Sequence, residues 1–136
     1  AWQATHSAAG TAAAMTLLAL SLATPALADQ AYDACVSKGQ TDADYRECGG
    51  AWLERADADL NKMWKALHEI TTPDTGKALL EEQRAWNAYK EKSCLFWASG
   101  EYGTMGSALS FPACRAAVIE ARTTALGEYL DELKDQ

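Results

Sequence analysis

Histidine and basic residues are scarce in this chain. Its 136 residues include two histidines, and 12 Lys and Arg stand against 19 Asp and Glu, which gives a net charge of −7. A protein of this charge is not expected to bind nucleic acid or an anionic membrane surface, because both repel it. We therefore expect cationic partners, toward which the charge would steer the protein.

The residue pattern of a metal site is also missing. There is no C-x-x-C pair, and only one histidine, His68, lies beyond residue 28. Zinc sites are usually built from closely spaced cysteine and histidine ligands. We therefore predict neither a metal nor any other cofactor.

No apolar run is long enough to span a bilayer as a helix. The main run, residues 12–23, reads AAAMTLLALSLA, whereas a spanning helix needs about 20 residues. Pro25 and then Ala26-Leu27-Ala28 follow, an A-x-A pattern typical of signal-peptide cleavage. Although no Lys or Arg precedes the run, we interpret residues 1–28 as a secretory signal peptide. Residues 29–136 would then form one periplasmic or secreted domain, without stable membrane insertion after cleavage.

All four cysteines lie in this mature part: Cys35, Cys48, Cys94 and Cys114. An even number of cysteines behind a signal peptide is typical of disulfides formed in an oxidising compartment. Three pairings are possible, and spacing alone does not choose among them. We expect Cys94–Cys114, which would close a Gly/Ser-rich loop and stabilise the fold by about 3 kcal/mol. Cys35–Cys48 would then tie down the N-terminal segment.

The chain lacks the alternation of apolar and polar residues that marks a strand. Apolar residues instead recur every three or four positions, which is the period of amphipathic helices. We predict an all-α fold, a small antiparallel three-helix bundle stapled by two disulfides, with helices over residues 45–70, 73–97 and from about 111 onward. Thr72 should cap the second helix and Ser110 the third, with an irregular loop over residues 98–110. Gly49-Gly50 in the first helix indicates either a later start or a close neighbour.

A cluster of polar residues is expected at one height of this bundle. Aligning the helices about the Thr72 turn brings together Asp57, Asn61, Gln83, Arg84, Asn87 and Arg122. We interpret the cluster as a structural network that fixes the helix register, with Arg122 beside Trp86 and near the Asp57 carboxylate. The alternative, an active site, lacks a nucleophile, a histidine and a facing pair of carboxylates, so we predict no catalytic residue. The helical spacing of the tryptophans predicts core positions for Trp52, Trp64, Trp86 and Trp97.

Several short motifs together resemble the LprI-like lysozyme-inhibitor family of small secreted bacterial proteins. The matching residues are Cys48, Asp57-x-x-Leu60-Asn61, Gln83-Arg84-Ala85-Trp86, Tyr89, Cys94, Gly106-Ser107, Cys114, Arg122 and Leu126. The resemblance covers nearly the whole mature part and departs from the family pattern at Lys90 and at Gly49-Gly50. It implies a helical, disulfide-bonded domain of the cell envelope, and inhibition of lysozyme rather than enzymatic activity.

Two functions follow as hypotheses. In the first, the protein inhibits lysozyme or another cationic glycan hydrolase, which it binds through its acidic surface and the 98–110 loop. The partner-binding residues would be Glu101, Tyr102, Met105 and Ser107, with Tyr102 as an amphipathic anchor. In the second, it is an envelope binding or adaptor module without inhibitory activity.

Overall fold

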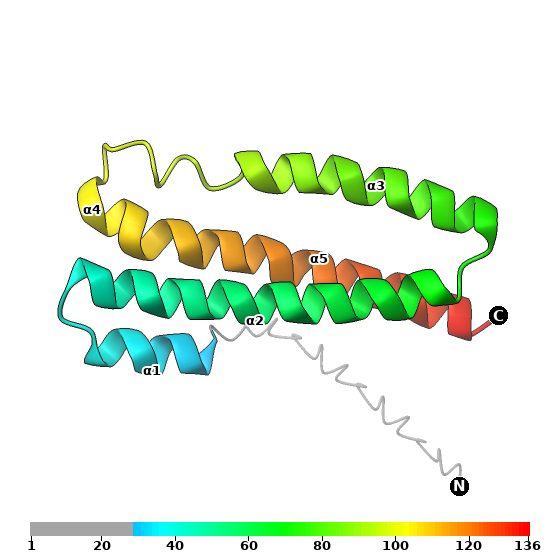
Figure 1. Ribbon diagram of the computed structural model, residues 1–136, viewed down its shortest axis with the longest axis horizontal. Helices are drawn as coiled ribbons and strands as arrows, with labels where there is room; N and C mark the ends of the chain where they lie inside the picture. Colours follow the sequence, from blue (N-terminus) through cyan, green and yellow to red (C-terminus); the bar gives the residue numbers. More distant parts are fainter. Residues whose placement is uncertain (1–28) are drawn as a thin grey trace, which may run out of the picture.

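The computed structural model describes residues 29–136, and these residues are mainly helical, with no strand among them (Figure 1). The signal peptide predicted for residues 1–28 lies outside the described residues. The main helices are α1 (Gln30–Lys38), α2 (Asp42–Glu69), α3 (Pro73–Lys92) and α5 (Phe111–Lys134). The predicted all-α fold and both predicted disulfides are confirmed.

Helices α2 and α5 form the core of the protein and lie side by side along most of their length (Figure 1). The largest fully buried side chains, Leu67, Ile119 and Leu126, all belong to these two helices. A hydrogen bond also joins the two helices, in which the indole N–H of Trp52 donates to Glu120 Oε1 at 2.7 Å. Burial of such large apolar side chains is the main source of stability in a domain of this size.

The two glycines of α2 have different surroundings. A Cβ on Gly49 would lie 2.6 Å from Cβ and Cγ of Pro112, whereas a Cβ on Gly50 would meet nothing within 4 Å. Gly49 therefore lets the start of α5 approach α2 closely. The helix runs through both glycines and begins at Asp42, capped by Thr41, so of the two alternatives the close neighbour is correct.

Helix α1 is an additional helix beyond the three that we predicted, and it occupies the N-terminal segment. Cys35–Cys48 joins it to α2, with a Cα–Cα distance of 5.7 Å. Its Tyr32 ring packs on Trp52, with ring centroids 4.7 Å apart. At its N-terminus Asp29 caps the helix and pairs with Arg55 of α2 at 2.6 Å. The disulfide and these contacts allow a nine-residue helix to stay folded, because an isolated helix this short is unstable in water.

Helix α3 begins as predicted, with the Thr72 side chain accepting the Thr75 N–H and Pro73 at the first helical position. Its predicted end at residue 97 is wrong. The helix stops at Lys92, because Cys94 adopts the left-handed φ of 68°, which a helix cannot continue through. Only two residues of α3 are buried, Gly76 and Leu79, so this helix is attached to the core more loosely than α5.

The 98–110 segment is also more regular than expected. A single turn, α4 (Gly103–Met105), and a π-helical turn, η1 (Gly106–Ser110), lead directly into α5. Ser110 makes no side-chain capping bond, because η1 and α5 are continuous and leave no free helix start to cap. The irregular connection is therefore shorter than predicted and covers residues 93–102.

The two neighbouring glycines offer a matched test of the core packing. We expect Gly49→Ala to lower the free energy of unfolding by about 1–2 kcal/mol, because its methyl group would collide with the rigid Pro112 ring. Gly50→Ala should raise it by about 0.5–1 kcal/mol, because the site is open and alanine favours the helix. Urea unfolding of both variants measures the difference, and stabilisation by both would contradict the close approach of α5.

A second prediction concerns acid and the start of α2. The Asp44 carboxylate accepts the N–H groups of Gln40 and Thr41, and these bonds lower its pKa below the ordinary value of 3.8. Because the pKa of Asp44 is lowered in the folded state, its ionised carboxylate stabilises the fold at pH values above 3.8. This stabilisation is lost as the pH falls through the folded-state pKa. Asp44→Asn should therefore be less stable than the wild type at pH 6, and the difference should shrink toward pH 2. Thermal unfolding across this range measures it, with Asp59→Asn as the control.

Candidate functional site

The connection between α3 and α5 carries an exposed group of large apolar side chains. We call it the aromatic end, and it consists of Leu95, Phe96, Trp97, Tyr102 and Met105. Three rings pack on one another, with centroid distances of 5.1 Å for Phe96–Trp97, 4.8 Å for Phe96–Tyr102 and 5.0 Å for Trp97–Tyr102. The exposed fractions are 60 % for Phe96, 47 % for Leu95 and Met105, and 40 % for Tyr102. Side chains of this kind gathered on a surface are typical of protein contact sites.

Backbone geometry holds the aromatic end in shape. The chain turns through positive φ at Cys94, Gly100 and Gly103, and Cys94–Cys114 fixes the start of the connection to α5. A Cβ on Gly106 would lie 2.5 Å from the Trp97 carbonyl oxygen and 2.6 Å from Tyr102 Cβ. Gly106 therefore allows the connection to fold back closely on itself, and the three rings meet as a result.

The four residues predicted to bind a partner have unequal positions. Glu101, Tyr102 and Met105 are exposed, and Tyr102 belongs to the ring cluster. Ser107 is half-buried; its hydroxyl accepts a bond from Arg46 at 3.4 Å and donates to the Thr104 carbonyl at 3.1 Å. Its side chain is thus engaged in holding η1 against α2.

Two exposed residues of the aromatic end were missed from the sequence, Leu95 and Phe96, because we placed them on α3. Trp97 was expected in the core, but it is only half-buried and packs on Phe96 and Tyr102. One signal was available in the sequence. Leu95, Phe96 and Trp97 are consecutive, and three consecutive large apolar residues cannot share one helix face.

A polar clasp joins α3 to α5 at mid-length. It consists of Glu82, Gln83, Arg122 and Tyr129. The Arg122 guanidinium, in a residue only 8 % exposed, donates to Glu82 Oε1 at 2.6 Å and to Gln83 Oε1 at 2.8 Å. The Tyr129 hydroxyl donates to the same Glu82 oxygen at 3.1 Å. Arg122 Nη2 is buried without a partner among the described residues, which offsets part of the stabilisation by the other bonds.

The expected polar cluster is only partly assembled. Five of its six members line one shallow hollow between α2 and α3: Asp57, Asn61, Gln83, Arg84 and Asn87. Arg122 lies beside Trp86, 6.0 Å from its ring centroid, but its carboxylate partner is Glu82 and not Asp57 as expected. Asp57 is exposed and makes no ion pair within residues 29–136, because it sits on the α2–α3 side while Arg122 faces the α3–α5 side.

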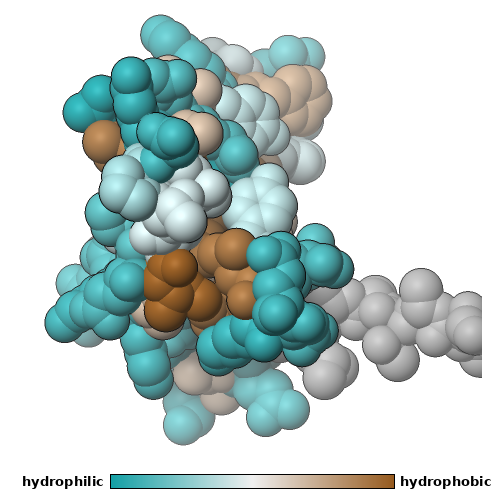
Figure 2. All heavy atoms as spheres, turned by 90° about the vertical axis from the view of Figure 1, so that its right-hand side faces the viewer, coloured by the Kyte–Doolittle hydropathy of each residue, from teal (hydrophilic) through white to brown (hydrophobic). Residues whose placement is uncertain are grey.

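Negative charge gathers at the opposite end of the molecule. The segments 67–82 and 128–136 together carry eight carboxylates and two lysines, and so account for most of the net charge of −7. They lie where the α2–α3 turn and the C-terminus meet, away from α4 (Figure 1). Figure 2 faces this acidic end and shows a small apolar area with hydrophilic residues around it. The acidic surface and the 98–110 segment, which we expected to act together, are therefore far apart.

The described residues offer little for metal or thiol chemistry. Within residues 29–136, no group of three or more His, Cys, Asp or Glu side chains is placed to hold a metal ion. The four cysteines are all paired in the two disulfides. Within residues 29–136 the most distinctive surfaces are the aromatic end and the acidic end.

A family model described as lysozyme inhibitor LprI matches residues 33–126. The match spans both disulfides, the aromatic end and every member of the clasp except Tyr129. The chain belongs to the LprI lysozyme-inhibitor family. No curated protein and no solved structure matches it.

The clasp predicts different outcomes for two arginines that the sequence placed in one cluster. Arg122→Ala should lower the free energy of unfolding by about 1–3 kcal/mol, because it removes the hydrogen bonds that the buried guanidinium donates to Glu82 and Gln83. Arg84→Ala is the control and should change it by no more than about 0.5 kcal/mol, because Arg84 is exposed. Thermal unfolding followed by circular dichroism compares them, and equal losses would contradict the assignment of the clasp.

Proposed function

We propose that this protein is a periplasmic or secreted inhibitor of lysozyme or of a related cationic glycan hydrolase, which it binds through the aromatic end. The observation that carries the proposal is the coincidence of the family match with an exposed, internally packed ring cluster. The protein would act without catalysis, by covering part of the hydrolase surface.

The aromatic end has the physical properties of a binding anchor. Aromatic side chains bury a large area on binding and lose little side-chain entropy, since they have only two rotatable angles. Phe96 and Tyr102 are already packed against Trp97, and the backbone around them is held by Cys94–Cys114. This surface is therefore already ordered in the free protein, so little further conformational entropy would be lost when a partner binds.

The negative charge would act at longer range. The Debye length is about 8 Å at physiological salt, so carboxylates at the distant acidic end add little to the contact at the aromatic end, and their effect is on the rate of encounter at low salt. We infer that they accelerate association with a cationic hydrolase, and that the aromatic end slows dissociation.

The two disulfides support a location outside the cytoplasm. Both disulfides link segments of a small domain, as is common in proteins of oxidising compartments. Secretion would further depend on the signal peptide predicted for residues 1–28. None of the helices within residues 29–136 is long and apolar enough to cross a membrane.

An adaptor in the cell envelope is the second candidate function. An exposed apolar surface such as the aromatic end can bind a structural protein as well as a hydrolase. A lysis assay separates the two functions: the purified protein should slow the lysis of bacterial cell walls by lysozyme in a dose-dependent way. Failure to bind lysozyme even at low salt would remove the inhibitor function and leave the adaptor.

The roles of the two ends lead to a kinetic prediction. Tyr102→Ala should raise the rate of dissociation from lysozyme about tenfold, as expected for the loss of an interface hot spot. The salt dependence of association should stay unchanged, because the substitution leaves the charge as it is. Surface plasmon resonance at two ionic strengths measures both rates.

Tyr89→Ala is the control, because Tyr89 is also an exposed tyrosine (59 % against 40 % for Tyr102) and lies on α3, outside the aromatic end. Tyr102→Ala should cost the fold only about 0.5–1.5 kcal/mol through its lost ring contacts, which thermal unfolding can check. If Tyr102→Ala left dissociation unchanged and Tyr89→Ala raised it, the contact would lie on α3.

A further inference from the structure

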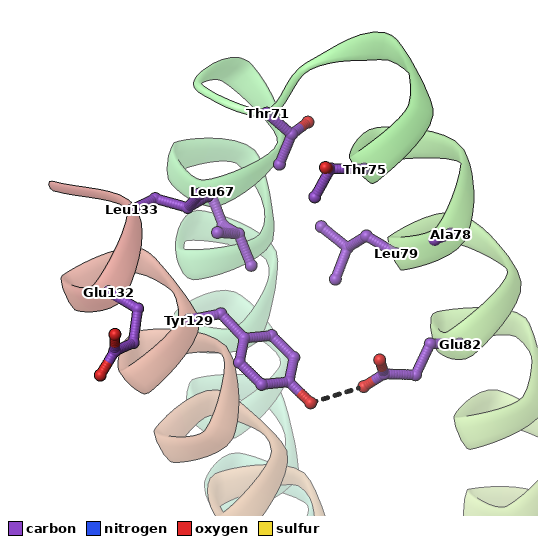
Figure 3. A pocket seen from close by; sticks show the side chains of 9 residues that line it. All are labelled: Leu67, Thr71, Thr75, Ala78, Leu79, Glu82, Tyr129, Glu132 and Leu133. Carbon is purple, nitrogen blue, oxygen red and sulfur yellow. Dashed lines mark hydrogen bonds between the residues drawn. The ribbon is translucent and has the colours of Figure 1, made fainter. Parts of the chain in front are cut away.

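A pocket of about 280 Å³ opens at the acidic end, between α3 and α5 and over the end of α2 (Figure 3). Its lining residues come from all three helices and the turn between two of them: Leu67, Thr71, Thr75, Ala78, Leu79, Glu82, Tyr129, Glu132 and Leu133. Drug-sized ligands usually occupy pockets of about 300–1,000 Å³. This pocket therefore suits a smaller group, of the size of a single side chain.

The interior of the pocket is apolar. Leu67 and Leu79 are buried and continuous with the main core, and Leu133 packs against that core from α5. Figure 3 shows the Tyr129 ring between α5 and α3, closing the pocket toward the middle of the bundle. Such a surface suits an alkyl chain, because contact with it removes apolar area from water.

Two carboxylates stand on opposite sides of this apolar interior. Figure 3 shows Glu82 on α3 and Glu132 on α5, with Tyr129 between them. Glu82 Oε1 accepts the bonds of the clasp, while its Oε2 accepts none within residues 29–136. Glu132 is exposed and makes no ion pair with another described residue.

The surroundings add to this negative field. The two segments that meet here, 67–82 and 128–136, carry eight carboxylates against two lysines. Neither of these lysines, Lys77 or Lys134, forms an ion pair within the described residues. A second copy of the same surface would be repelled, whereas a cationic group would be attracted.

We propose that this pocket binds the side chain of a lysine or arginine presented by a partner protein. The alkyl stem would lie against Leu67, Leu79 and Leu133, and the cationic head would remain at the mouth, in the negative field of Glu82, Glu132 and the other carboxylates of the acidic end. Lysine and arginine bury their stems in this way while keeping the charge in water. The site lies at the opposite end from the aromatic end and does not depend on the protein being an inhibitor.

The test uses two peptides that differ only in the cationic head. N-acetyl-Gly-Lys-Gly-amide carries the ammonium group, and the same peptide with norleucine keeps the stem without it. Titration of the isotope-labelled protein, followed by chemical shifts, should show saturable changes for the lysine peptide at Thr71, Thr75 and Tyr129. The norleucine peptide should bind at least about threefold more weakly, and 0.5 M salt should weaken the lysine peptide.

Variants of the protein separate the pocket from the general negative charge. Ala78→Trp would fill the pocket at unchanged charge and should abolish the saturable shifts. Glu132→Gln should weaken binding about two- to fivefold, the effect of one exposed charge pair. Glu128→Gln makes the same charge change on α5 outside the pocket and should leave binding within about twofold. Thermal unfolding confirms that each variant is folded.

Three results would overturn the proposal. One is the absence of saturable shifts with the lysine peptide, and a second is equal binding of the norleucine peptide, which would make the pocket a purely apolar site. The third is binding that survives Ala78→Trp, which would assign the attraction to the acidic surface as a whole. None of these results depends on the lysis assay, so the pocket and the inhibitor function can fail separately.

Discussion

The close packing of α2 against α5 is the contact on which the rest of the molecule depends. Gly49 lets the Pro112 ring lie directly on α2, and the largest buried side chains fill the seam beyond it. Both other main helices are attached to this pair. Helix α1 is held by Cys35–Cys48 and by Tyr32 on Trp52, so it adds a second layer without a core of its own.

Helix α3 is attached at three places, and this pattern shapes the surfaces available to a partner. The Thr72 turn holds one end, the clasp between Glu82 and Arg122 holds the middle, and Cys94–Cys114 holds the other end. Between the turn and the clasp lies the acid-lined pocket. Beyond the disulfide the chain leaves the helix and forms the aromatic end. A more tightly packed α3 would have closed the pocket.

Membership of the LprI family and the separation of these surfaces suggest a division of labour. The aromatic end has little charge of its own and suits a contact that is slow to dissociate, since apolar anchors act mainly on dissociation. The acidic end carries the negative charge that would attract cationic groups, and it contains the pocket that we propose for one of them. An elongated bundle keeps the two apart, so each can be altered without disturbing the other.

The sequence determined the local features of this protein. The apolar period of three to four residues, the Thr72–Pro73 helix start and the acidic composition depend on neighbouring residues, and all were predictable. The spacing of the cysteines left three pairings open. The correct pairs followed once Cys94–Cys114 was assumed to close the Gly/Ser-rich loop. The tertiary structure decided which groups meet across helices. Cys94 adopts a left-handed φ, so α3 ends at Lys92 and Trp97 lies outside the core. Arg122 pairs with Glu82 because Asp57 lies on the α2–α3 side of the bundle, away from Arg122. Such outcomes depend on how helices rotate and approach one another, which a periodic pattern does not specify.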